Sequence, residues 1–177
     1  MIIVRDDDVL TLASKWDDPV SRFIEVHELI CQAPNHLFHV PTILVADIQK
    51  FPVAVSYMQS EVKKGTMIPE IHGWDHIDYG TIAQGEITGR LLKCIGWFHD
   101  TFNYTPTKWY TPWHATSDDM VASAKYLNLQ IVLETPNLRL EGIKQIRNNI
   151  DCELMIHWWS PQDTNRIERL VNEAAKL

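Results

Sequence analysis

Two histidines with a four-residue spacing are the first residues in this sequence that could do chemistry. His72 and His76 directly follow the apolar run 67–71, and Gly73 allows the chain to turn sharply between them. An i, i+4 spacing places two imidazoles on one face of a helix, and a strand that turns into a helix can also bring them together. The pair therefore indicates a metal site, although two unrelated surface histidines would give the same spacing.

A cluster of three acids follows the first apolar run of the chain. Asp6, Asp7 and Asp8 come directly after Ile2-Ile3-Val4. Adjacent carboxylates repel one another unless a cation or a proton is present, so one aspartate could bind a metal while its neighbour holds the attacking water. A solvated acidic turn is the alternative. Two histidines and one carboxylate leave coordination positions open, which is typical of a catalytic metal site.

Two further segments carry groups suited to hydrolysis. His157 closes the apolar run 152–156, where an imidazolium could protonate a leaving amine. In the segment Tyr110-Thr111-Pro112-Trp113-His114, proline fixes the chain and the Trp113 backbone N–H could face a developing oxyanion. Taken alone, each has a plainer interpretation, as a core histidine and as a packed aromatic turn.

The elements that must position these groups alternate along the chain. Apolar runs predict strands at 2–5, 40–45, 67–71, 108–113, 129–134 and 152–158. Helical spacing predicts helices at 19–34, 51–64, 86–102, 117–127 and 161–177, with weaker spacing at 140–148. Strands that are apolar on both faces and alternate with helices indicate a parallel sheet or barrel wrapped by helices. Active sites of such folds lie at the carboxyl ends of the strands, where all the polar motifs fall.

Composition narrows the classes of protein. A length of 177 residues favours one domain over residues 1–177. The net charge of -7, without a Lys/Arg run, argues against nucleic acid as a partner. No stretch approaches the roughly 18 apolar residues of a membrane span, and no signal segment precedes the first strand. Three scattered cysteines, Cys31, Cys94 and Cys152, predict free thiols in a reducing, cytoplasmic setting. Seven tryptophans include several beside the polar motifs, where aromatic faces suit sugar rings.

Together these residues resemble the polysaccharide deacetylases, the NodB-homology or family 4 carbohydrate esterases. The family pattern has an Asp-Asp pair after strand one and a His-x-x-x-His pair after strand three. It also has a Pro-aromatic segment after strand four and a Leu-x-His segment at a late strand. The matching residues here are Asp7-Asp8, His72 with His76, Pro112-Trp113 and Met155-Ile156-His157. The match spans nearly the whole chain in the family's order.

The resemblance implies a distorted, trimmed (β/α) barrel of six to seven parallel strands and a metal-dependent hydrolase that removes acetyl groups from a sugar or polysaccharide. It implies that Asp7 is the general base, that His157 is the general acid and that the Trp113 N–H contributes to the oxyanion hole. The metal ligands would be Asp8, His72 and His76. Zinc suits this donor set best, and iron, cobalt or nickel would also fit.

Departures from the family pattern leave alternatives open. An Asp6-Asp7 register would also fit the acidic cluster, and Tyr110 replaces an arginine that orients the base, a role that Arg5 could take. Glu134 or Asp151 could be the carboxylate partner of His157. A non-catalytic carbohydrate-binding protein on the same barrel, or a metal hydrolase of another amide or ester, are the rival functions. The sequence does not indicate the oligomeric state or the sugar.

Overall fold

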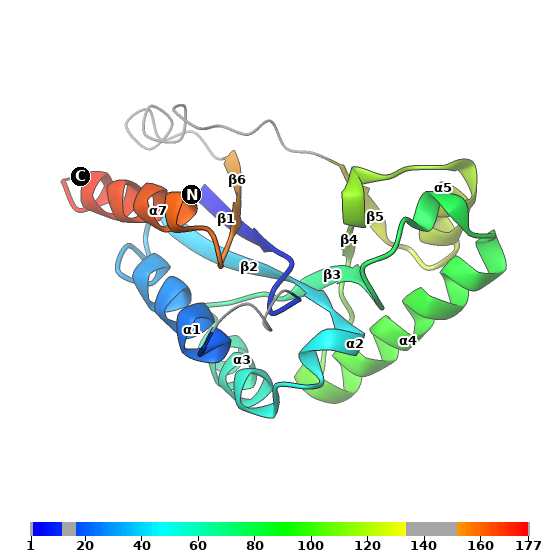
Figure 1. Cartoon of the computed structure of the whole chain (residues 1–177), viewed down its shortest axis with the longest axis horizontal. Helices are drawn as coiled ribbons and strands as arrows, with labels where there is room; N and C mark the ends of the chain where they lie inside the picture. The colour runs from blue at the N-terminus through cyan, green and yellow to red at the C-terminus, as the bar shows by residue number, and fades with distance from the viewer. Residues whose placement is uncertain (1, 12–16, 134–151, 177) are drawn as a thin grey trace.

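The centre of the molecule is a six-stranded parallel sheet (Figure 1). The computed structural model describes residues 2–11, 17–133 and 152–176. The strands are β1 (Ile2–Asp7), β2 (Leu37–Leu44), β3 (Glu70–Gly73), β4 (Lys108–Tyr110), β5 (Gln130–Val132) and β6 (Cys152–His157). Their order across the sheet is β5-β4-β3-β2-β1-β6, and every neighbouring pair is parallel. The sheet curls into a half-barrel, which confirms the predicted trimmed (β/α) barrel.

Helices cover the sheet in an order that follows the strands. They are α1 (Pro19–Ile30), α2 (Val45–Ile48), α3 (Pro52–Lys64), α4 (Gln84–Phe102), α5 (Asp118–Tyr126) and α7 (Pro161–Ala174), with short 3-10 turns η2 (Tyr79–Thr81) and η3 (Pro112–His114). Helix α7 packs on α1, α1 on α3, α3 on α4, and α4 on α5. This belt leaves the carboxyl ends of the strands to be connected by loops, so that edge of the sheet is where side chains can gather.

Local signals in the sequence account for the helix ends. The Asp18 carboxylate accepts a hydrogen bond from the Ser21 N–H at 3.0 Å, and Pro19 occupies the first turn of α1. Helix α3 ends at Gly65, whose φ of 74° lies in the left-handed region that glycine adopts without steric cost. Ser117 and Ser160 accept hydrogen bonds from the first turns of α5 and α7 in the same way.

Strand boundaries differ from the predicted ones at several places. Strand β1 extends to Asp7, and β4 ends at Tyr110 because Pro112–His114 form the 3-10 turn η3. Strand β2 begins at Leu37, before the predicted residue 40, because the buried His39 interrupts the apolar pattern within the strand. Strand β3 begins at Glu70 instead of residue 67. The predicted helix 140–148 lies outside the described residues, so it and the single domain over 1–177 stay predictions.

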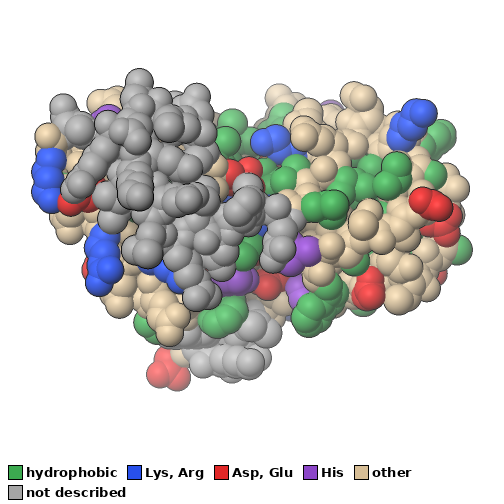
Figure 2. Space-filling view, turned by 90° about the horizontal axis from the view of Figure 1, so that it is seen from above, with side chains coloured by type: hydrophobic (Ala, Val, Ile, Leu, Met, Phe, Trp, Pro, Cys, Tyr) green, Lys and Arg blue, Asp and Glu red, His purple; other side chains and the backbone are tan. Residues whose placement is uncertain are grey.

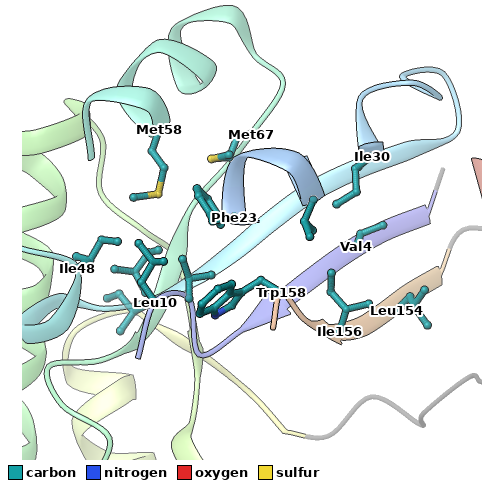
Figure 3. Packing of buried hydrophobic residues seen from close by; sticks show 14 of the residues in the cluster. Val4, Leu10, Phe23, Ile30, Ile48, Met58, Met67, Leu154, Ile156 and Trp158 are labelled. Carbon is teal, nitrogen blue, oxygen red and sulfur yellow. The ribbon is translucent and has the colours of Figure 1, made fainter. Parts of the chain in front are cut away.

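The hydrophobic core lies between the sheet and the helices (Figure 3). Helix α1 buries Phe23 and Ile30 against the inward side of β1, which contributes Val4. Trp158, directly after β6, is fully buried among these apolar side chains. No described helix is long and apolar enough to span a membrane. Cys31 and Cys94 are free thiols, as predicted.

Candidate metal and acid–base site

Residues from the ends of four strands meet around one small polar cavity. The cavity has a volume of about 170 Å³. Its lining residues are Asp7, Asp8, His72, His76, Thr111, Trp113, His114 and His157. Histidine and acidic side chains gather near the middle of the face shown in Figure 2. The structure therefore brings together every residue that the sequence predicted for the site.

The hydrogen bonds of His72 fix which of its ring nitrogens faces the cavity. Its Nδ1 lies 2.6 Å from the backbone carbonyl of Tyr110, which can only accept, so Nδ1 carries the proton. The Nε2 atom then points to Asp8, 3.1 Å from its Oδ1. Metal-binding histidines are oriented in this way by a partner on the second nitrogen.

Asp8, His72 and His76 form a set of donors that could hold a metal ion. The Asp8 Oδ1 lies 3.1 Å from Nε2 of His72 and 3.0 Å from Nε2 of His76, and the three donor atoms lie within 4.8 Å of one another. Ligands at about 2.1 Å from a tetrahedral zinc are separated by about 3.4 Å, so the spacing fits such an ion. Partial burial alone raises the pKa of Asp8, but the two imidazoles outweigh it and hold the pKa well below its ordinary value. The carboxylate is therefore ionised and ready to bind a cation.

Asp7 is held by a different pair of groups. Its Oδ1 accepts a hydrogen bond from Thr42 Oγ1 at 2.9 Å, and its Oδ2 lies 3.1 Å from Nη2 of Arg5. Arg5 is buried, contacts Glu153 at 3.2 Å, and lies 4.9 Å from the centre of the Tyr110 ring. The ion pair expected between Arg5 and Asp7 is thus present, and Tyr110, which stands where the family pattern has an arginine, packs against the Arg5 guanidinium.

His157 has a carboxylate partner that the sequence did not reveal. The Asp163 Oδ2 accepts the backbone N–H of His157 at 3.1 Å and lies 3.7 Å from its Nδ1. Burial alone lowers the pKa of His157, but the Asp163 carboxylate and the β1 aspartates outweigh it and raise the pKa. The suggested partners Glu134 and Asp151 lie outside the described residues. Asp163 could have been found from its place in the first turn of α7, three residues after the N-cap Ser160.

Asp6 turns away from the cavity into the core. Its Oδ1 accepts the Trp158 N–H at 2.8 Å, and its Oδ2 lies 3.6 Å from Nε2 of the buried His39. The Nδ1 of His39 lies 2.9 Å from the Nδ1 of His27, and the Nε2 of His27 lies 3.3 Å from the Glu61 carboxylate. Burial raises the pKa of Asp6 well above its ordinary value. Of the two possible registers, Asp7-Asp8 is therefore the one that faces the cavity.

Trp158 ties the two strand ends together. Its indole Nε1 donates to the carbonyl of Asp8 at 3.0 Å, while its backbone N–H donates to Asp6. Asp8 itself has a φ of 58°, a left-handed conformation that is uncommon in residues other than glycine but that aspartate adopts more readily than most. The hydrogen bond from Trp158 supports this turn, which aims the Asp8 carboxylate at the two histidines.

The backbone of the Pro-Trp segment is also left-handed. Trp113 has a φ of 58° and His114 a φ of 51°. The Trp113 side chain is 67% exposed, and its ring lies edge-on to His76 with the centres 4.7 Å apart. Position 73, in the same region, requires glycine for a steric reason, because a Cβ there would come within 2.9 Å of the Tyr79 hydroxyl.

Comparisons with known proteins agree with this architecture. The sequence matches no protein-family model and no curated protein. A family 4 carbohydrate esterase from Streptomyces lividans, solved with acetate, superposes with a TM-score of 0.72 over 98% of this chain and 86% of its own, at 14% identity. The chain has the fold of the family 4 carbohydrate esterases.

Two other proteins with this fold differ in activity, since one is an enzyme and the other a pseudoenzyme. The peptidoglycan deacetylase PdaC from Bacillus subtilis matches with a TM-score of 0.67 at 13% identity, covering 99% of this chain and 83% of its own. A family 4 pseudoenzyme from Bacillus anthracis matches with a TM-score of 0.70 at 11% identity, covering 99% of this chain and 60% of its own. Because both enzymes and a pseudoenzyme share this fold, the chemistry has to be argued from the side chains of the site.

Replacing Trp158 with phenylalanine should destabilise the protein more than the same change at Trp159. Trp158→Phe removes the indole N–H that supports the left-handed turn at Asp8, whereas the indole N–H of Trp159 has no hydrogen-bond partner among the described residues. We expect an additional loss of about 1–2 kcal/mol in the free energy of unfolding, measured in urea. Equal losses for the two variants would contradict the role assigned to this hydrogen bond.

Proposed function

We propose that this protein is a metal-dependent hydrolase that removes an acetyl group, most readily an N-acetyl group, from a sugar or polysaccharide. The observation that carries the proposal is the meeting of a candidate metal triad, an arginine-paired aspartate and a carboxylate-paired histidine around one cavity. The deacetylase fold supports the choice of reaction. Peptidoglycan or a related acetylated glycan is the substrate class that these neighbours favour.

Asp8, His72 and His76 are the residues that would hold the metal. Two imidazole nitrogens and one carboxylate oxygen suit Zn²⁺, and the same set would accept iron, cobalt or nickel. When bound, a divalent ion at this place polarises the acyl carbonyl and makes water a better nucleophile. A proton on Nδ1 of His72, fixed by the Tyr110 carbonyl, leaves its Nε2 free for this purpose.

The remaining residues divide the proton transfers between them. Asp7 accepts the proton of the attacking water, and Arg5 and Thr42 keep its carboxylate in one orientation. The backbone N–H of Trp113 stabilises the charge that develops on the acyl oxygen. His157, whose raised pKa favours the imidazolium, protonates the amine as the C–N bond breaks.

A non-catalytic protein that binds carbohydrate on this barrel is the second candidate. The pseudoenzyme from Bacillus anthracis favours it, because that protein has the same fold. The intact set of acid, base and candidate metal donors favours the enzyme. A screen for acetate release from acetylated glycans and from simple amides and esters separates the deacetylase from the binding protein. The same screen identifies a hydrolase that acts on another amide or ester.

We expect the zinc-loaded protein to release acetate from acetylated glycans such as peptidoglycan fragments or N-acetylglucosamine oligomers, detected by an enzyme-coupled acetate assay. His157→Ala should lower kcat by about 10²–10⁴-fold, because the leaving amine then lacks its acid. His99→Ala, a change at an exposed histidine on α4, is the control. Retained sugar binding with no acetate release under Zn²⁺, Fe²⁺, Co²⁺ or Ni²⁺ would contradict the enzyme and favour the binding protein.

Removing the charge of Asp163 should shift the pH dependence of the reaction. The negative carboxylate favours the imidazolium of His157, so Asp163→Asn should lower the pKa of His157. His157 acts in its protonated form, and the alkaline limb of the kcat/KM profile should therefore move to lower pH. Asp119→Asn, in the first turn of α5, is the matched control and should leave the limb in place. If the alkaline limb does not move in Asp163→Asn, the ionisation that causes this limb is not that of His157.

A further inference from the structure

The two histidines of the candidate metal site are held in different ways. His72 lies within β3, and its Nδ1 atom is fixed by the Tyr110 carbonyl at 2.6 Å. His76 lies beyond the end of β3 in the bend of residues 74–77, the His76 loop, and its Nε2 is 3.0 Å from Asp8. Among the described residues, no hydrogen bond holds its second ring nitrogen, Nδ1. Metal-binding histidines are usually oriented by a partner on that nitrogen, so the position of His76 depends on the backbone of its loop.

A tyrosine hydroxyl lies in the middle of the His76 loop. The Trp74 N–H donates to the Tyr79 hydroxyl at 2.8 Å, and the hydroxyl donates to Asp75 Oδ1 at 3.4 Å. The Tyr79 ring is fully buried and lies edge-on to Trp109 with the centres 5.3 Å apart, which fixes the place of its oxygen. Gly73 leaves the space for this oxygen, because a Cβ would come within 2.9 Å of it. The loop is therefore folded around one fixed polar atom.

Helix α4 holds the other oxygen of Asp75. Arg90 Nη1 forms an ion pair with Asp75 Oδ2. The guanidinium is itself held one helical turn back, where Nη2 lies 2.8 Å and Nε 3.2 Å from Oε1 of Glu86. The Arg90 and Asp75 side chains are 24% and 34% exposed, and ion pairs of this kind add little to the stability of the whole fold. The consequence of this pair is local, because it fixes the residue directly before His76.

Other contacts hold only the beginning of the loop. The Trp74 carbonyl accepts the N–H of Ala46 in α2 at 2.8 Å. The Trp74 ring lies beneath the ammonium of Lys93 in α4, which is 5.4 Å from the ring centre. These contacts fix where the chain leaves β3. Asp75 is the next residue along the chain, and it connects the end of the loop to α4 and to the buried hydroxyl.

We propose that Arg90 and Tyr79 are positioning residues of the metal site that act through Asp75. Together they keep Nε2 of His76 close to the other two donor atoms, so that the loop is already ordered when the metal binds. The inference rests on the metal-dependent function proposed above and identifies what holds its least supported ligand. None of these three side chains lines the cavity, so none has to touch the substrate or the metal.

The zinc Kd, measured by competition with a chromogenic chelator, tests the contribution of Arg90. Arg90→Gln should raise the Kd about 10- to 100-fold, the scale on which the supporting partners of metal ligands act. Loss of a positive charge near a cation site would by itself strengthen zinc binding, so a weaker Kd reports lost positioning and not lost charge. Arg90→Lys, whose charge can still pair with Asp75, should bind zinc more tightly than Arg90→Gln. Arg22→Gln, which loses an ion pair with Glu25 in α1, is the matched control and should bind like the wild type.

Two further variants test whether the contacts act as one chain. Tyr79→Phe keeps the buried ring and should raise the zinc Kd about three- to ten-fold, the scale of one lost hydrogen bond. Tyr126→Phe, at a side chain that is 75% exposed, is its control. Because Arg90 acts through Asp75, the double variant Arg90→Gln/Asp75→Asn should bind zinc no more weakly than Asp75→Asn. Effects that multiply in the double variant would show that the two residues act separately, and would overturn the proposed chain.

The same measurements distinguish this inference from the proposed function. An unchanged zinc Kd in Arg90→Gln and Tyr79→Phe, each shown to be folded by thermal unfolding, would overturn the inference and leave the deacetylase proposal intact. Measurement of the Kd needs no turnover. Weaker zinc binding in these variants would therefore support the inference even if the zinc-loaded wild type released no acetate. A wild type that binds no zinc would overturn both.

Discussion

Three consecutive carboxylates lie at the end of β1, and the negative charge of each has to be neutralised or paired with a different group. The rest of the site depends on how these charges are accommodated. Asp6 enters the core, where burial favours its neutral form and the Trp158 N–H binds it. Asp7 pairs with Arg5 and Thr42. Asp8 faces two imidazoles. Like charges that would repel one another in a plain acidic turn are thus given three different environments within three residues.

The parallel sheet makes this separation possible. Successive residues of a strand point to opposite faces, which sends Asp6 and Asp7 in opposite directions. The left-handed backbone of Asp8 then redirects the chain, so that its carboxylate reaches His72 and His76 at the end of β3. Because β1 lies between β2 and β6, Thr42 and His157 reach the same edge from either side. One irregular residue therefore connects side chains that are 64 and more positions apart in sequence.

Much of this arrangement can be predicted from the sequence because its signals are local. The alternation of apolar strands with helices indicates the parallel sheet, and strand ends locate His72, His76, Asp7 and Asp8. The partner of His157 was missed because it does not lie at a strand end: Asp163 reaches His157 through the packing of α7 after β6, and its only signal in the sequence is its place in the first turn of that helix. The burial of Asp6 could not be predicted from the sequence either, because it depends on His39 in the neighbouring strand β2. The start of β2 was misplaced for the same reason.

The central claim is that Asp8, His72 and His76 bind one divalent metal ion, and the metal content of the purified protein tests it most directly. After equilibration with Zn²⁺ and removal of the excess, elemental analysis should find about one zinc per chain in the wild type and in His99→Ala. His72→Ala should retain almost none, because two donors bind zinc far more weakly than three. A wild type without zinc, or a His72→Ala variant with as much zinc as the wild type, would contradict the account.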